Sequence, residues 1–324
     1  MMVAIGVSPG TWLRSGPYVP DQRQRLYVSR LDVPRDAIGG GIDVAGAWRL
    51  RSTNHHFSGY SALLAMGDGT LLAMTDHRRQ MRFTAPDAAH RSVSFDFFAR
   101  PGAGNERVID LESVTRDPVS GYLWGAYERT NHIERYDADR TIAQAWPRAM
   151  RSWPDNRGPE AMVRLADGRF VVLSEGSPHW FAADLPGLVF AGDPVDGVEP
   201  KSFRFRPPED FVPVDMAQLP DGRVLILLRA LRWGLPPTFE GKLIVADPGT
   251  IRPGERWAWR DVAHLAAPLP MDNYEGLAVE PGEEGKLVLW LISDDNHSKF
   301  QRTLLLKLLW RPNEKARELP RAPS

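Results

Sequence analysis

Apolar residues in this chain occur as pairs of short runs separated by a tight turn, and this unit recurs five times. Each unit begins with an apolar strand, turns at an Asp-Gly, Ser-Gly or Glu-Gly pair, and returns as a second apolar strand. Glycine supplies the positive φ that such hairpin turns require. The units occupy residues 61–76, 112–128, 160–175, 215–229 and 275–294. The pattern therefore predicts five β-hairpins spread over almost the whole chain.

The spacing of the hairpins predicts a β-propeller. Units built from strands that recur about every 50 residues are typical of propeller blades, which pack around a central channel. Each hairpin then supplies the two inner strands of a blade. The following segments supply the outer pair, such as 81–83 with 92–98, or 241–246 with 256–260. We expect an all-β fold, a single β-propeller with five or six four-stranded blades.

The two ends of the chain are expected to meet in one blade. Only one clear outer strand, residues 302–310, follows the last hairpin, and a strand near residues 46–52 would complete that blade. Such a closure removes the exposed edges of the sheet. We expect a propeller domain over residues 25–311, an irregular lead-in over 1–24 and a polar tail over 312–324.

Composition narrows the partners of the protein. The formal net charge is −1, so no basic field favours nucleic acid. The chain has no cysteine, which excludes disulfides and thiolate metal sites. No apolar stretch is long enough to span a bilayer. We expect a monomer that acts on a small anionic or ester substrate.

Carboxylates recur at two equivalent places in the hairpins. Four open the first strand, at Glu112, Glu160, Asp215 and Glu275, and four follow the second strand, at Asp76, Glu128, Glu175 and Asp294. The start of the first strand and the end of the second lie on the same face of a blade. The pattern therefore predicts that the first four converge at one mouth of the channel, as catalytic groups and metal ligands.

Histidines and basic residues gather in the loops of the same face. His77 and His132 are candidate catalytic acids or bases. The candidate substrate-binding residues are Arg78, Arg129, Arg229, Lys299, His179 and His297. The planar fork of arginine matches a phosphate or carboxylate group, which favours an anionic substrate.

Several carboxylates at one channel cannot all stay ionised without compensation. They bind a cation, pair with arginine or share protons. The oxygen-rich set of Glu112, Glu160, Asp215, Glu275 and Asp294 favours a divalent hard cation, Ca²⁺ first, whereas added imidazoles favour a transition metal. Arg229 is the competing neutraliser. The alternative is structural, because carboxylates at strand starts also accept backbone N–H bonds that lock neighbouring blades.

Short motifs at the strand ends carry a family resemblance. They are residues 57–63, 110–113, 158–161, 213–216 and, most specifically, 272–278 (Asp-Asn-Tyr-Glu-Gly-Leu-Ala) with 290–296 (Trp-Leu-Ile-Ser-Asp-Asp-Asn). They resemble the phytase-like propeller family, described as having esterase-like activity of phytase. The resemblance implies a bacterial and usually exported hydrolase, periplasmic or otherwise exported. The apolar run at residues 1–7 is then a remnant of an export signal or a frayed terminus, and a cytoplasmic location stays open.

Two classes of function remain at this point. The first is a hydrolase that cleaves a phosphate or carboxylic ester at the channel mouth with the help of a metal, including a lactonase of the gluconolactonase kind. The second is a non-catalytic propeller that binds a small ligand or a protein on the same face. A polar, ionisable rim favours the hydrolase, and a broad apolar rim would favour the binding protein.

Overall fold

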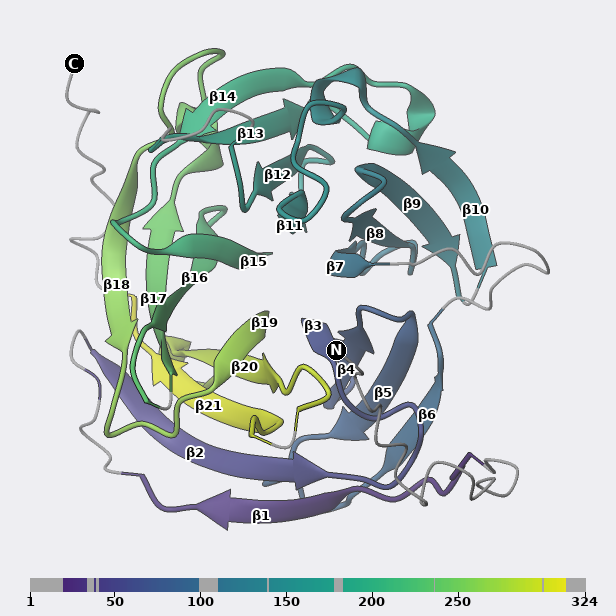
Figure 1. Cartoon of the computed structure of the whole chain (residues 1–324), viewed down its shortest axis with the longest axis vertical. Coiled ribbons are helices and arrows are strands. Elements are labelled where there is room, and N and C mark those ends of the chain that lie inside the picture. The colour runs from purple at the N-terminus through teal and green to yellow at the C-terminus, as the bar shows by residue number, and fades with distance from the viewer. Residues whose placement is uncertain are drawn as a thin grey trace, which may run out of the picture.

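The computed structural model describes residues 20–33, 38, 41–98, 110–138, 140–177, 183–235, 237–298 and 300–312. His179, Lys299, the first part of the expected lead-in and nearly all of the expected tail lie outside these residues. The described chain forms five antiparallel sheets around a channel (Figure 1). The prediction of an all-β propeller is confirmed, and the number of blades is five.

Each blade begins with the strand nearest the channel and continues outward. The first blade contains β3 (Tyr60–Ala65), β4 (Thr70–Thr75), β5 (Arg79–Thr84) and β6 (Val93–Phe97). The second contains β7 (Leu111–Arg116), β8 (Leu123–Tyr127), β9 (His132–Asp137) and β10 (Arg140–Ala145). The third contains β11 (Pro159–Arg164), β12 (Phe170–Ser174), β13 (Leu185–Phe190) and β14 (Lys201–Phe205). The fourth contains β15 (Val212–Gln218), β16 (Val224–Arg232), β17 (Thr238–Ala246) and β18 (Trp259–Leu265).

The last blade joins both ends of the described chain. From the channel outward it contains β19 (Asn273–Pro281), β20 (Leu287–Asp294), β21 (Leu304–Trp310), β2 (Ile42–Arg51) and β1 (Tyr27–Leu31). The expected closure by an N-terminal strand is therefore confirmed, with Trp48 opposite Leu305 in the ladder. This blade differs from the expected four-stranded form, because β1 pairs with β2 and adds a fifth strand.

Short 3₁₀ turns are the helical elements of the described chain: η2 (Arg148–Met150), η3 (Pro194–Asp196), η4 (Pro248–Thr250) and η5 (Glu283–Gly285). No helix in the described ranges has the length and apolar character needed to cross a membrane. The second residue of each predicted turn pair, Gly69, Gly121, Gly168, Gly222 or Gly285, has a φ between +72° and +89°, as the turns require.

One expected outer strand is displaced along the chain. The apolar residues at 256–260 suggest a strand there, but β18 begins only at Trp259. Trp257 instead turns into the core, where its ring packs on Phe203 at 5.6 Å and its indole N–H donates to the carbonyl of Asp247. Tertiary packing of one large aromatic ring overrides the local strand preference.

Apolar residues from adjacent sheets pack between the blades. At the contact of the last and first blades, buried Trp48, Leu50 and Trp290 join Tyr60 and Leu63 in one cluster. Closure of the ring is therefore stabilised by side-chain burial as well as by the ladder between β2 and β21.

Replacement of Trp48 tests this closure. Trp48→Ala should lower the free energy of unfolding by about 3–5 kcal/mol, because the ring is buried and contacts Trp290 at a centroid distance of 6.0 Å. The matched control Trp233→Ala removes a ring that is 89% exposed. That control should change stability by no more than about 0.5 kcal/mol in urea denaturation. Equal losses in the two variants would contradict the role of β2 in closing the ring.

Candidate functional site

The inner strand of every blade contains a β-bulge at the same place. The register with the second strand shifts by one residue near the start of β3, β7, β11, β15 and β19. The bulged residues are Ser61, Glu112, Glu160, Val214 and Glu275. A bulge re-aims the side chain of its extra residue, and bulges are frequent next to active sites. Three of the four carboxylates predicted to open the inner strands occupy this position.

Asp215 does not occupy it. It lies one residue after the bulge, where β7 has Ser113. Its buried carboxyl accepts hydrogen bonds from the backbone N–H of Leu277 at 2.6 Å and of Met216 at 2.8 Å. Ser113 likewise accepts the N–H of Met162 in the next blade at 2.9 Å. A shift of one residue turns a strand side chain to the other face. The structure thus places Asp215 between two blades, in the structural role kept open above, and not with the other acids.

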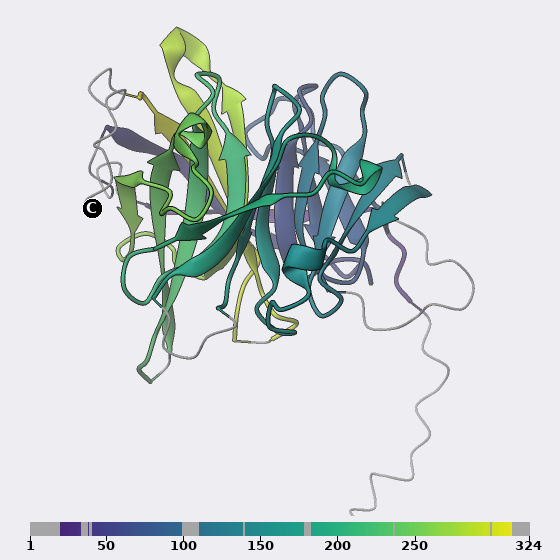
Figure 2. The same ribbon diagram turned by 90° about the horizontal axis from the view of Figure 1, so that it is seen from above.

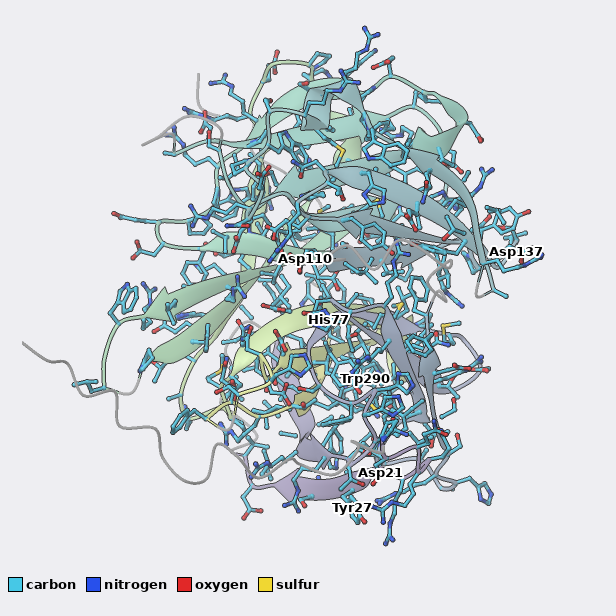
Figure 3. All side chains as sticks on the ribbon, turned by 45° about the vertical axis from the view of Figure 1, so that its right-hand side comes forward. Asp21, Tyr27, His77, Asp110, Asp137 and Trp290 are labelled. Carbon is cyan, nitrogen blue, oxygen red and sulfur yellow. The ribbon has the colours of Figure 1, made fainter. Side chains whose placement is uncertain are left out.

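The acids that do meet come from four of the five blades. We call the acid cluster the carboxyl groups that interact with one another at this channel mouth: Asp76, Asp110, Glu112, Glu128, Glu160, Glu175, Glu275 and Asp294. In Figure 3, Asp110 and His77 lie close to the middle of the propeller, whereas Tyr27 and Asp137 lie at its outer edge. The cluster therefore includes all four predicted acids that follow the second strands and three of the four that open the first strands, Asp215 being the exception.

Arg229 is the fourth blade's counterpart of the acids that end the second strands. Its guanidinium donates to Glu175 at 2.7 Å, to Asn273 at 2.9 Å and to Glu275. Asn273 also donates to Glu275, at 2.7 Å. Burial would lower the pKa of Arg229, but the charges of Glu275, Glu175 and Glu160 outweigh it and raise that pKa. The Arg229 guanidinium therefore stays charged and is held in the acid cluster by Glu175, Asn273 and Glu275.

Three arginines contact acids of the cluster: Arg229, Arg129 at Asp110 and, at 3.8 Å, Arg157 at Glu175. They do not balance so many acids, and protons take up part of the charge. Burial, followed by the charges of neighbouring carboxylates, raises the pKa of Glu112 and of Glu160 well above the usual range. Protonated Glu112 donates a hydrogen bond to Asp110, and protonated Glu160 donates one to Glu128. Burial and the charge of Glu275 raise the pKa of Asp294 to about 8. At neutral pH the cluster therefore holds carboxylic acids beside carboxylates.

Two groups of side chains offer metal-binding atoms close to one another. Asp110, Glu112 and Glu128 present oxygens that all lie within 4.8 Å of one another. Asp76, His77 and His297 present a second such set of oxygen and nitrogen atoms. His77 and His297, predicted as catalytic and substrate-binding residues, thus lie at the channel mouth. Arg129 lies there as well and donates to Asp110 at 2.6 Å.

His132 and Arg78 lie in a buried network outside the acid cluster. His132 Nε2 is 3.0 Å from Glu134 Oε1, and Arg78 pairs with the same oxygen at 2.9 Å. Burial would raise the pKa of Glu134, but hydrogen bonds from His132 and Tyr136 and the charge of Arg78 lower it to about 2. These contacts link the first and second blades. Neither residue is part of the site proposed below.

A cavity of about 510 Å³ opens beside Arg229. Its lining is mixed, with arginine, acidic, amide and apolar side chains: Arg157, Glu175, Asp210, Val212, Arg229, Leu231, Arg232, Trp233, Phe239, Asn273 and Asn296. The hairpin of β16 and β17 forms part of the wall, and in Figure 2 this green hairpin extends below the neighbouring strands. Beside it, Trp233 is almost fully exposed. The cavity can receive the organic part of a ligand whose polar end reaches the acid cluster.

Several residues of this site were not among the candidates predicted from the sequence. Asp110 and Asn273 precede Glu112 and Glu275 by two positions, and residues two apart on a strand share a face. This spacing was a usable signal. Arg157, in contrast, lies in the loop before β11, and no periodic pattern marks it.

The fold and the cluster define a five-bladed β-propeller with an acidic mouth at one end of its channel. The family model for the phytase-like family, described as "Esterase-like activity of phytase", matches residues 55–297. The chain belongs to this family.

Other comparisons give more distant similarities. No curated protein matches the sequence. Among solved structures, an α-L-arabinofuranosidase from Podospora anserina in complex with cellotriose is 12% identical, with a TM-score of 0.46 over 79% of this chain and 93% of that chain. A hypothetical protein from Leishmania major is 10% identical, with a TM-score of 0.45 over 82% and 90%. Such similarities do not indicate a function.

The raised pKa values predict how stability depends on pH when no cation is present. An unfolded aspartic acid titrates near pH 4, whereas Asp294 titrates at about 8 in the folded chain. The folded chain therefore keeps protons that the unfolded chain has lost, and stability falls as pH rises toward 8. Melting curves in chelator should show a lower melting temperature at pH 8 than at pH 6.5. This window lies above the range in which His56, whose pKa burial lowers to about 4, adds the opposite slope.

Asp294→Asn should flatten this dependence, and Glu209→Gln, which changes an exposed acid, should leave it unchanged. A melting temperature that rises between pH 6.5 and 8 in the unaltered chain would contradict the buried, protonated state of the cluster.

A second prediction separates Asp215 from the acid cluster. Asp215→Ala leaves the buried N–H of Leu277 without its acceptor, so it should destabilise the fold by about 1–3 kcal/mol. Asp215→Asn keeps an acceptor oxygen and should lose less. Glu112→Gln removes a protonated acid from a crowded acidic site and should not destabilise the fold. Urea denaturation measures the loss of stability in the three variants. A larger loss in Glu112→Gln than in Asp215→Ala would contradict the separation of Asp215 from the acid cluster.

Proposed function

We propose that the protein hydrolyses an ester at the acidic mouth of the channel with the help of a bound divalent cation. The observation that carries the proposal is the set of Asp110, Glu112 and Glu128, whose oxygens lie within 4.8 Å of one another inside the acid cluster. An all-oxygen set fits a hard cation, and Ca²⁺ accepts such ligands in flexible geometry. Glu160, Glu275 and Asp294 complete the surroundings; Asp215 is not a ligand in this proposal.

Electrostatics supports the cation. Arg229 binds Glu175 and Glu275 directly, while Glu112 and Glu160 pair with other carboxylates through shared protons. Like charges so close in a partly buried site repel one another strongly. A divalent cation would replace those protons and neutralise the same charge. A bound cation of this kind lowers the pKa of a coordinated water and polarises an ester oxygen.

The side chains of the chain divide the remaining tasks. Asp294, whose pKa burial and the charge of Glu275 raise to about 8 when no cation is bound, is the side chain of the cluster suited to carry a proton to a leaving group. Arg157, whose contact with Glu175 is 3.8 Å, lines the cavity and is suited to an anionic group of the substrate. Arg232 also lines the cavity but already pairs with Asp210 and Glu240 at 3.0 Å. Phe239 and Trp233 provide an apolar surface for its organic part. Arg229 is already bound by Glu175 and Glu275, so its first task is to hold these acids in place.

The acid cluster also separates two classes of ester. A phosphate ester carries negative charge, and the cluster repels it unless a cation is bound. A carboxylic ester or a lactone is neutral at the reacting group and can enter without that neutralisation. Phosphate ester hydrolysis should therefore require the cation absolutely, whereas hydrolysis of a carboxylic ester should decrease less when the cation is removed.

A non-catalytic propeller that binds a ligand is the second candidate. The exposed Leu231 and Trp233 in the lining of the cavity favour it, because exposed apolar side chains at a cavity mark binding sites. Such a protein would bind a ligand at the cavity without turnover.

Metal analysis, melting curves and a substrate panel together test the proposal. Elemental analysis of the purified chain should find Ca²⁺ or a similar ion. Ca²⁺ at 100 times its Kd should stabilise the chelator-treated chain by about 2.7 kcal/mol. Glu112→Gln and Glu160→Gln should reduce this stabilisation and the hydrolysis of phosphate esters, acyl esters or lactones. The control Glu209→Gln should change neither.

An unchanged melting temperature in chelator, with no metal found, would mean that Arg229 and shared protons balance the cluster by themselves. Binding of panel compounds without turnover would favour the ligand-binding propeller.

A further inference from the structure

Asp76, His77 and His297 form a compact group where the first and last blades meet. Asp76 and His77 directly follow β4, and His297 lies in the connection between β20 and β21. Their oxygen and nitrogen atoms all lie within 4.8 Å of one another. The two imidazole rings are stacked, with centroids 5.7 Å apart and planes at 25°. We propose that this group is a second metal site, distinct from the oxygen set of the proposed hydrolase, and that it takes a borderline transition-metal dication of the Zn²⁺ class.

An unsatisfied buried atom points to a missing ligand in this group. Asp76 Oδ1 is buried and has no hydrogen-bond partner among the described residues. The other oxygen, Oδ2, lies 3.3 Å from His77 Nδ1. Buried acceptors in native proteins are nearly always paired, and an ion is one of the usual partners when no protein donor is present.

Gly59 provides the room that the group needs. Its φ is +75°, and a Cβ at this position would lie 2.9 Å from His297 Nε2 and 3.0 Å from Asp76 Oδ1. Any larger residue would therefore separate these two atoms or displace the loop. Glycine in a strand or at its start often marks a close approach of a ligand or another chain segment. Here it lets side chains from two blades approach the same point.

The loop that carries His297 is held by a dedicated carboxylate. Asp295 accepts hydrogen bonds from the backbone N–H of Gly59 at 3.2 Å and of His297 at 3.3 Å, and from the hydroxyl of Thr303 at 2.9 Å. Ser58 donates to it as well. His297 itself has a φ of +51°, a conformation that is sparsely populated for residues other than glycine. Strained backbone held in this way by several bonds is frequent at functional sites.

The chemistry of the donors selects the metal class. Two imidazole nitrogens and one carboxylate oxygen suit Zn²⁺ and its neighbours in the first transition row, whereas Ca²⁺ prefers oxygens alone. The side chain of His77 is 51% exposed, so a metal held here would keep at least one position open to solvent. This site depends on neither Ca²⁺ nor ester hydrolysis, and so the inference stands independently of the proposed function.

Cobalt is the probe for the test, because Co²⁺ occupies such sites and its visible absorption reports nitrogen ligation and coordination number. The full chain, treated with chelator, is titrated with Co²⁺ and with Zn²⁺ by absorption and calorimetry. Asp295→Asn changes a partner that holds the loop of His297 against Gly59 without being a ligand, and it should weaken binding about 10- to 100-fold. His77→Gln and His297→Gln remove ligands and should each weaken Co²⁺ binding by more than that.

His264→Gln is the matched control. His264 is 52% exposed, close to the exposure of His77, and it pairs with Glu240 in the fourth blade, far from this group. The His264→Gln variant should bind Co²⁺ with the same affinity and absorption spectrum as the unaltered chain. Melting curves without metal check that each variant is folded, and Zn²⁺ should raise the melting temperature of the unaltered chain but not of the double variant His77→Gln/His297→Gln.

The inference is overturned if that double variant binds Co²⁺ with the affinity and spectrum of the unaltered chain, or if the unaltered chain binds none. In the latter case the contact between Asp76 and His77 is a direct side-chain contact that holds no metal. A chain that hydrolyses esters with Ca²⁺ but fails this titration would overturn the second site and leave the proposed hydrolase intact. A chain that binds Co²⁺ through these histidines but cleaves no ester would support the second site and contradict the proposed hydrolase.

Discussion

One extra residue near the start of each inner strand is the constraint on which this site depends. The bulge occurs in all five blades, so five positions around the channel are set apart from the regular alternation of strand side chains. Three of them carry glutamates, and the acids that end the second strands lie beside them. The acid cluster is thus a product of the repeat itself. Part of its negative charge is neutralised by Arg229, which stands in the fourth blade where the other blades have an acid after the second strand. Another part is neutralised by protons shared between neighbouring carboxyl groups.

The two groups of potential ligands in this mouth differ in chemistry and in anchoring. Asp110, Glu112 and Glu128 come from one blade and offer oxygens alone, whereas Asp76, His77 and His297 come from two blades and include nitrogen. The first group is rigid, because its members lie on or directly beside paired strands. The second depends on a loop held by Asp295 and on the absence of a side chain at Gly59. A propeller mouth can thus hold unlike sites a short distance apart, since each blade contributes its own strand ends.

Much of the fold could be predicted from the sequence, because hairpin glycines and apolar runs are local signals that repeat. The pairing of strand 46–52 with the last blade could be inferred from a missing outer strand alone. The register of Asp215 was predicted wrongly although the sequence contains a signal: Asp215 precedes the glycine of its Asp-Gly turn by seven residues, whereas Ser61 and Glu160 precede theirs by eight. The ladder shows the corresponding slip of one residue. Arg78 lies in a loop of the expected face, and His132 is the first residue of β9 on that face. Their side chains turn to Glu134, and that buried partner lies in β9, a strand without any repeat signal.

The closure of the ring has a consequence for synthesis of the protein on the ribosome. β2 leaves the ribosome before every blade strand except β1, yet its partner β21 is the last strand to appear. During almost the whole of translation, β2 can therefore pair only with β1, and the edge of β2 that faces β21 has no native partner. An unpaired strand edge is prone to pair wrongly. The other four blades consist of consecutive strands and can form one after another. The nascent chain is thus an open row of blades, and it becomes a ring in a single late step.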